Sequence, residues 1–309
     1  MIKYFYKSIR STSLEELAAP QRGAWVYVEA PTEKEIADLT KRFKLEAGYL
    51  EDALDEDEQP RLERESEQSY IFVRFAYKNK DGEMDTAPLL IMFDSEIVLT
   101  VSRVHLPVLD YFMRGRTPFA TTQRAKLILL ILSQISTQYD NSISQTSRKI
   151  KAIRSRLRTQ GITNQDLIDF VTIEDQLNEF LASLLPTNAT LRRLLVGRHI
   201  PLFEEDQDIV EDLLLNNDQS IETSRSNLKS VSNIRDAYTA ITSNNLNQTI
   251  TLLTLATILV ALPNVFFGMY GMNVKLPYQH ADWAFPAIIT FNLILIVAIV
   301  IFARKKRII

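Results

Sequence analysis

The sequence predicts an α/β domain with a mixed, largely antiparallel sheet, followed by a long helix and two C-terminal transmembrane helices. Three observations indicate this fold class. Residues 1–120 hold short β-rich runs and one capped helix. From about residue 122 the apolar residues follow a spacing of three and four, which is typical of helices. Residues 247–303 carry only two charges, Lys275 and Asp282.

The α/β region covers residues 1–120. Thr32 followed by Glu35 forms a capping box, and this predicts a helix from Glu33 to Phe43. The runs rich in β-branched and aromatic residues predict strands at 24–28, 70–77, 89–93 and 97–101. Because tight turns join neighbouring strands, we expect antiparallel pairing over much of the sheet.

Helices are predicted throughout residues 121–271. Residues 121–203 indicate a helical hairpin, with helices over 122–158 and 164–196 and a break near Gly161. From 204 to 270 the only proline is Pro263 and the only glycine is Gly268. A helix of that length extends about 100 Å, which favours a stalk that runs from the cytosol into a membrane.

Two apolar runs, residues 249–270 and 284–303, are each long enough to cross a bilayer. The stalk with its first span therefore covers 204–271, an outer loop covers 272–283 and a basic tail covers 304–309. Positive charge beside a span is typical of its cytosolic end, and residues 1–13 hold no signal peptide. We expect a multi-pass protein of the cell (inner or plasma) membrane, in contact with lipid, with both termini cytosolic.

Composition argues against several functions. The net charge of −3 and 24% charged residues do not indicate a nucleic-acid partner. The absence of cysteine excludes disulfides and thiol chemistry, and the histidines 105, 199 and 280 form no local ligand pair. Residues 1–246 contain neither a phosphate-binding glycine loop nor the order of a catalytic triad. We therefore expect no enzyme activity.

One face of the first span is small and polar. At the alternating step of three and four residues it carries Asn247, Ile250, Thr254, Thr257, Ala261, Asn264, Gly268 and Gly271. Such a stripe either packs closely against another helix or lines water. Asn264 near mid-span favours water, and the same face continues below the membrane to Asp236, where a carboxylate suits a cation channel. Two spans cannot enclose a pore alone, so the pore requires a symmetric assembly.

Several motifs together resemble the CorA family of magnesium channels. Tyr270-Gly271-Met272-Asn273 ends the first span and is followed by a short loop, a last span and a basic tail. Two further segments are similar to the family's stalk, and a third is similar to its cytosolic domain. These segments are Asp236-Ala237-Tyr238, residues 243–247, and Leu50-Glu51-Asp52 with Gln59-Pro60-Arg61.

The resemblance implies a funnel-shaped homopentamer with a cytosolic α/β/α domain that transports Mg²⁺ and is also regulated by it. Gly271, Met272 and Asn273 would form the mouth that selects the hydrated ion. Asn264 and Asn247 would be polar rings in the pore. Ile250, with Leu253 or Thr254 and Thr257, would form the hydrophobic constriction. Asp52 and Asp212 would bind regulatory Mg²⁺ between subunits, with Glu51 as a secondary ligand.

Two features leave alternatives open. Six of the eight residues in 51–58 are acidic, and such a run is also typical of a solvated helix end. The loop 274–282 departs from the family because it carries Lys275 and only one acid, Asp282, while His280 suits a softer metal. The same architecture could therefore transport Zn²⁺, Co²⁺ or Ni²⁺, with or without proton coupling, or serve as a membrane sensor without transport.

Overall fold

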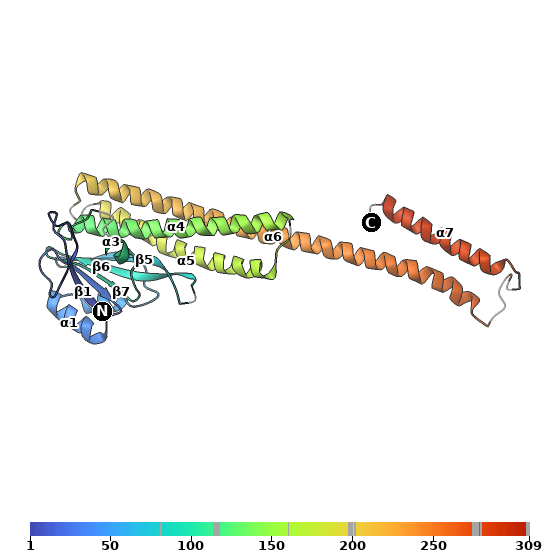
Figure 1. Ribbon diagram of the computed structural model, residues 1–309, viewed down its shortest axis with the longest axis horizontal. Coiled ribbons are helices and arrows are strands. Elements are labelled where there is room, and N and C mark those ends of the chain that lie inside the picture. Colours follow the sequence, from blue (N-terminus) through green and yellow to red (C-terminus); the bar gives the residue numbers. More distant parts are fainter. Residues whose placement is uncertain are drawn as a thin grey trace. The chain divides into compact units, whose positions relative to one another are not determined.

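The computed structural model describes residues 1–80, 82–113, 118–159, 161–196, 200, 202–273, 278 and 280–306. These residues divide into two compact units, Met1–Ile234 and Arg235–Ile309 (Figure 1). The first unit holds a sheet covered by helices, and the second holds the apolar helices.

A seven-stranded sheet forms the centre of the first unit, in the order β2-β1-β3-β7-β6-β5-β4. Only β3 and β7 pair in parallel, and the other neighbours are antiparallel, which confirms the mixed, largely antiparallel sheet. The strands are β1 (Ile2–Tyr6), β2 (Glu15–Leu17), β3 (Trp25–Glu29), β4 (Arg61–Glu65), β5 (Gln68–Lys78), β6 (Met84–Phe93) and β7 (Val98–Ser102).

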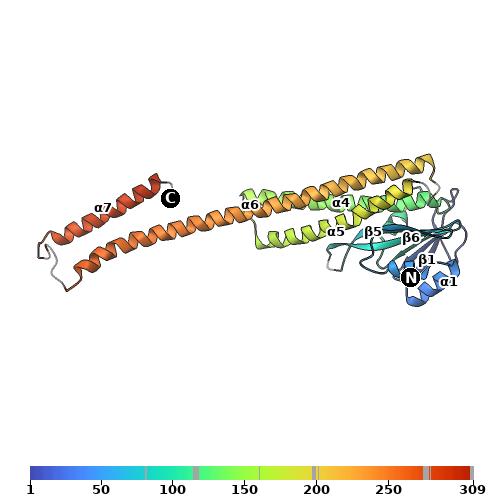
Figure 2. The ribbon, with the colours of Figure 1, turned by 180° about the vertical axis from the view of Figure 1, so that it is seen from behind.

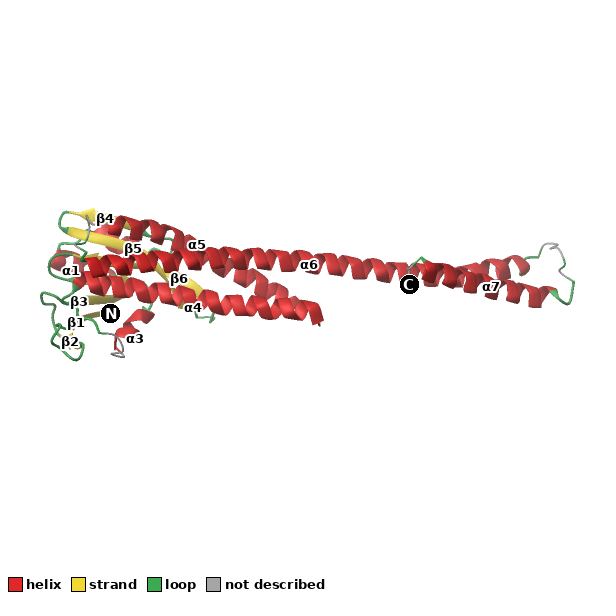
Figure 3. Cartoon of the chain, turned by 90° about the horizontal axis from the view of Figure 1, so that it is seen from above, coloured by secondary structure: helices red, strands yellow, loops and turns green. Residues whose placement is uncertain are grey.

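Helices cover both faces of this sheet (Figures 1 and 3). One face packs against α1 (Glu33–Phe43) and α2 (Ala47–Asp52). The other packs against α3 (Pro107–Met113), α4 (Arg124–Thr159), α5 (Asn164–Leu195) and the first part of α6 (Glu204–Tyr270). Alternate residues of β5 supply the two cores, with Phe72 facing α2 and Val73 facing the long helices. The unit is therefore a three-layer α/β/α domain.

Capping interactions set the starts of two helices. At α1 the Thr32 amide donates to Glu35 Oε2 at 2.8 Å, and the Glu35 amide donates back to Thr32 Oγ1 at 3.3 Å. Thr163 and Asp166 form the same reciprocal box at the start of α5. Gly161, with a φ of 84°, adopts a left-handed conformation that favours glycine. The hairpin break near Gly161 and the capped helix at 33–43 thus lie where the sequence placed them.

Helix α6 is a single helix of 67 residues that belongs to both units. Its first part buries one side, from Val210 through Leu213, Asn217 and Ser224 to Ile234. The compact unit therefore extends beyond residue 203, which we had taken as the boundary before the stalk. The second unit holds the rest of α6 and α7 (Ala284–Lys305), and both are long and apolar enough to cross a bilayer.

Five short elements were not predicted from the sequence: β1, β2, β4, α2 and α3. Of these, β2 has three residues, α2 has six and α3 has seven, and in such short segments periodicity gives little signal. Strand β4 lies at the edge of the sheet and reads Arg-Leu-Glu-Arg-Glu, so only Leu62 of this strand is buried.

Replacement of the α5 cap tests this account of the hairpin. Thr163→Ala removes the acceptor of the Asp166 amide and should lower stability by about 1 kcal/mol, the typical effect of losing an N-cap. Thermal melting of the detergent-solubilised protein measures the change. The matched control is Thr172→Ala in the interior of α5, where alanine is the better helix former, and it should not lower the melting temperature. Equal melting temperatures for Thr163→Ala and wild type would contradict the assignment.

Candidate functional site

One side of the apolar part of α6 packs against α7 within the second unit. Phe266 and Phe291 lie with ring centroids 5.2 Å apart. Figure 2 shows α7 running back along the last part of α6. Buried and half-buried side chains on both helices mark this contact. On α6 these are Thr251, Leu255, Leu259, Leu262 and Pro263, and on α7 they are Ile288, Asn292, Leu295, Ile296, Ile299 and Ala303. Asn292 is buried in this contact, and its Nδ2 donates to the Ile288 carbonyl at 2.9 Å, while its Oδ1 has no hydrogen-bond partner among the described residues.

The face that the sequence assigned to a pore lies on the opposite side of α6. At about 100° per residue, the pore positions centre roughly 150° away from the α7 contact. All of them are exposed, Ile250 at 51% and Leu253 at 62%. The exposed positions are Asp236, Asn247, Ile250, Leu253, Thr254, Thr257, Ala261, Asn264 and Gly268. The polar face is therefore left uncovered by the chain's own second span.

The threonines on this face present oxygen lone pairs outward. Thr254 Oγ1 donates to the Ile250 carbonyl at 2.8 Å, and Thr257 Oγ1 donates to the Leu253 carbonyl at 2.9 Å. Because each hydroxyl proton is used within the helix, the oxygen is left as an acceptor. A hydrated cation surrounds itself with water hydrogens, and such acceptors suit it.

Helix α6 ends at the Gly271-Met272-Asn273 motif. The Gly271 amide donates to the Phe267 carbonyl at 3.0 Å, and the Met272 amide donates to the Met269 carbonyl at 3.3 Å. A Cβ at position 271 would lie 3.3 Å from the Phe267 carbonyl oxygen, so glycine fits this close approach. The negative end of the helix dipole lies here and favours cations. Lys275, which weakened the magnesium assignment, lies outside the described residues.

The acidic segment 51–58 comprises the last two residues of α2 and the loop that follows it. Asp52, the last residue of α2, pairs with Arg61, whose Nη2 lies 2.6 Å from Asp52 Oδ2. Arg61 also pairs with Glu58 through Nη1. Glu51 is exposed. The sequence had singled out Asp52 and Glu51 but assigned no role to the arginine beside them.

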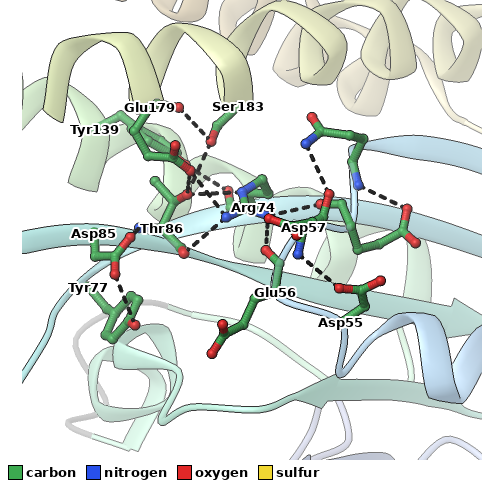
Figure 4. Close-up of polar contacts among 12 residues, drawn as sticks. Asp55, Glu56, Asp57, Arg74, Tyr77, Asp85, Thr86, Tyr139, Glu179 and Ser183 are labelled. Atoms are coloured by element: carbon green, nitrogen blue, oxygen red, sulfur yellow. Dashed lines mark hydrogen bonds and ion pairs between the residues drawn. The ribbon is translucent and has the colours of Figure 1, made fainter. Parts of the chain in front are cut away.

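Arg74 fixes the backbone of the same loop (Figure 4). Its Nη1 donates to the carbonyls of Glu56 at 2.7 Å and Glu58 at 3.0 Å. Its Nη2 lies 3.1 Å from Glu179 Oε1 on α5, so the loop and α5 share one guanidinium. Tyr139 on α4 donates to the Arg74 carbonyl at 3.1 Å, and burial raises the pKa of the Tyr139 hydroxyl, which stays protonated. No sequence pattern indicated this contact, because its members are far apart along the chain.

The chain alone does not bring Asp52 and Asp212 together. Asp52 ends α2 on one face of the sheet, whereas Asp212 is exposed on α6, which packs on the other face. Among the described residues, no group of three or more acids or histidines is placed to hold a metal ion. A cation that binds both carboxylates therefore requires two copies of the chain.

An α/β/α domain, one long continuous helix and two helices that are long and apolar enough to cross a bilayer are the architecture of a membrane protein with a large N-terminal domain. The family model described as CorA-like Mg²⁺ transporter protein matches residues 20–307. The chain belongs to this family of divalent-cation transporters, as the motifs had indicated.

Known relatives extend over nearly the whole chain. The cobalt/magnesium transport protein CorA of Methanocaldococcus jannaschii is 25% identical over 97% of this chain and 96% of its own length. The complete structure of a CorA magnesium transporter from the same organism matches with a TM-score of 0.86 at 21% identity, covering 99% of this chain and 98% of the other. The cytoplasmic domain of ZntB from Vibrio parahaemolyticus matches with a TM-score of 0.63 at 10% identity, over 78% of this chain and 98% of that domain. The structural likenesses establish the fold.

Cysteine substitution tests the uncovered face, and the chain has no native cysteine to interfere. Thr254→Cys, Thr257→Cys and Asn264→Cys should react with a small, charged, water-soluble thiol reagent in the reconstituted protein. Leu255→Cys and Leu259→Cys, on the α7 side, should react at least about tenfold more slowly, because only the thiolate in contact with water is the nucleophile. Mass spectrometry measures the rates. Faster reaction on the α7 side would overturn the assignment of this face to water.

Proposed function

We propose that this chain is one subunit of a homopentameric channel that takes up Mg²⁺ and is gated by cytosolic Mg²⁺ bound between subunits. The observation that carries the proposal is the polar face of α6, which α7 leaves uncovered and which continues from Gly268 through Asn264 and Asn247 to Asp236. A symmetric ring of such faces encloses a wet path that one chain cannot form. The name of the Methanocaldococcus jannaschii relative, a cobalt/magnesium transport protein, supports the choice of ion.

The residue types on the proposed pore face suit Mg²⁺. This ion gives up its water shell reluctantly, so neutral amide, hydroxyl and carbonyl oxygens can select it through its bound waters. Asn273, Asn264 and Asn247 supply amides, and the mouth at Gly271 and Met272 supplies backbone carbonyls. A cage of carboxylates would hold a dehydrated ion too tightly for rapid release. Carboxylate is therefore confined to Asp236, on the cytosolic part of the face.

The proposed gating depends on Asp52 and Asp212, which are too far apart within one chain to share a cation. Asp52 and Asp212 lie on opposite faces of their own domain, so in this proposal one cation binds both carboxylates only across an interface between two subunits. When empty, carboxylates that meet across an interface repel each other, and a divalent cation draws them together. In the proposed mechanism, bound Mg²⁺ holds a symmetric closed ring in which apolar rings at Ile250 and Leu253 exclude water. Loss of Mg²⁺ releases the subunits from this closed arrangement, and the constriction opens.

A second candidate keeps the architecture and changes the ion. His280, in the outer segment, offers an imidazole that suits Zn²⁺, Co²⁺ or Ni²⁺ better than Mg²⁺. Proton coupling belongs to this alternative. In either case we propose cytosolic termini, because the basic residues Arg304 and Lys305 follow the apolar run 284–303.

Ion flux tests the transport proposal. Proteoliposomes loaded with a magnesium-sensitive dye should show Mg²⁺ entry at low internal Mg²⁺, and Asn273→Ala should reduce that entry at least about tenfold by removing a selecting amide. Asn245→Ala, on another side of α6, is the matched control and should retain flux. Zn²⁺ entry without Mg²⁺ entry would establish the second candidate. Absence of flux for every divalent cation would leave the non-transporting sensor.

A fixed positive charge tests the regulatory pair. Asp212→Lys should place an ammonium where Mg²⁺ is proposed to bind, so that internal Mg²⁺ inhibits flux at least about tenfold less strongly. The matched control is Glu211→Lys, which makes the same charge change at the adjacent exposed position of α6. The proposed role of Asp212 fails if internal Mg²⁺ inhibits Asp212→Lys and the wild type equally.

A further inference from the structure

One guanidinium stands among three carboxylates beside the proposed regulatory site. Arg61 Nη2 lies 2.6 Å from Asp52 Oδ2, Nη1 pairs with Glu58, and Nε lies 3.8 Å from Glu63 Oε1. These acids come from the end of α2, the acidic loop and strand β4. The guanidinium therefore already supplies positive charge to Asp52 from within the chain.

This arginine is held in place. Its guanidinium carbon lies 4.1 Å from the centroid of the Phe72 ring, a cation–π contact against a ring that is only 1% exposed. Arg61 begins strand β4, which pairs with β5 directly opposite Phe72. The side chain is 30% exposed, so solvent reaches the charge without freeing it. The pairing of β4 with β5 and the contact with Phe72 therefore fix the position of the Arg61 side chain.

A positive charge beside Asp52 is electrostatically favourable. Asp52 is the last residue of α2, where the negative end of the helix dipole disfavours a carboxylate. In the absence of a divalent cation, Arg61 of the same chain supplies the positive charge that pairs with the Asp52 carboxylate. A carboxylate that is already paired gains less from an incoming cation than an unpaired one does.

We propose that Arg61 is an internal counter-cation that competes with Mg²⁺ for Asp52 and thereby sets the Mg²⁺ concentration at which the channel closes. The inference rests on the proposed regulatory role of Asp52 and assigns the control of its affinity. A hydrated divalent cation at Asp52 must share the carboxylate with a fixed positive charge, and the two cations repel. The acidic segment thus stays empty at low Mg²⁺ in spite of its six acids.

Neutralisation of this charge is the test. Arg61→Gln in the full-length protein in liposomes should lower the internal Mg²⁺ concentration for half-inhibition of flux by roughly three- to tenfold, a range discounted for the partial exposure of the pair. The matched control is Arg103→Gln. Arg103 pairs with Glu56 of the same acidic segment at 2.7 Å but makes no ion pair with Asp52 among the described residues. The control removes the same charge and should shift the threshold less than twofold.

A second variant distinguishes the loss of charge from a loss of packing at this position. Arg61→Met keeps an unbranched stem over Phe72, removes the charge, and should give the same shift as Arg61→Gln. In the Asp52→Asn background neither variant should increase Mg²⁺ sensitivity, because the contested carboxylate is gone. An unchanged or higher half-inhibition concentration in both single variants would overturn the inference.

The same experiment separates this inference from the proposed function. If internal Mg²⁺ does not inhibit the wild type, or if Asp212→Lys behaves as wild type, the proposed regulation itself fails. If the wild type is inhibited and Asp212→Lys is released while Arg61→Gln matches wild type, only the role assigned to Arg61 fails.

Discussion

A polar side chain on a membrane-spanning helix must meet water or a polar partner, and the C-terminal unit depends on this constraint. Helix α7 is almost wholly apolar, and its one buried amide, Asn292, bonds to its own backbone. It packs on the apolar side of α6 and so can satisfy none of the polar groups on the opposite side. Asn264 therefore requires water or a polar partner from outside the chain. The proposed water-filled path between copies would meet that requirement.

Pairing of opposite charges also shapes the acidic segment 51–58 of the N-terminal domain. Six acidic residues in 51–58 would repel one another strongly if they stood alone. Three arginines counter them in different ways: Arg103 pairs at the exposed edge, Arg74 holds the loop carbonyls, and Arg61 pairs with Asp52 and Glu58. Arg74 also reaches Glu179, so the loop conformation is tied to α5. Fixed cations thus neutralise part of the charge of this segment and hold its conformation.

Patterns that repeat along the chain predicted most of the fold. The capping box at Thr32, the break of the helical hairpin near Gly161 and the unbroken helix from 204 to 270 each depend on local chemistry, and each was predicted correctly. The polar face of the first span could also be found, since a helical period is visible in sequence. The packing of residues 204–234 into the α/β domain could not, because it depends on which helix meets which face of the sheet. Arg61 and Arg74 escaped notice for the same reason: their partners come from different elements, and only the folded sheet brings them together.

The central claim is that the polar faces of several α6 helices meet around one axis. Disulfide cross-linking between subunits tests it most directly, because the native chain has no cysteine. Oxidation of the reconstituted Thr257→Cys protein should produce covalent dimers, whereas Leu259→Cys, on the α7 side, should remain monomeric on denaturing gels. Cross-linking at 259 and none at 257 would place the polar face away from the axis and contradict the account.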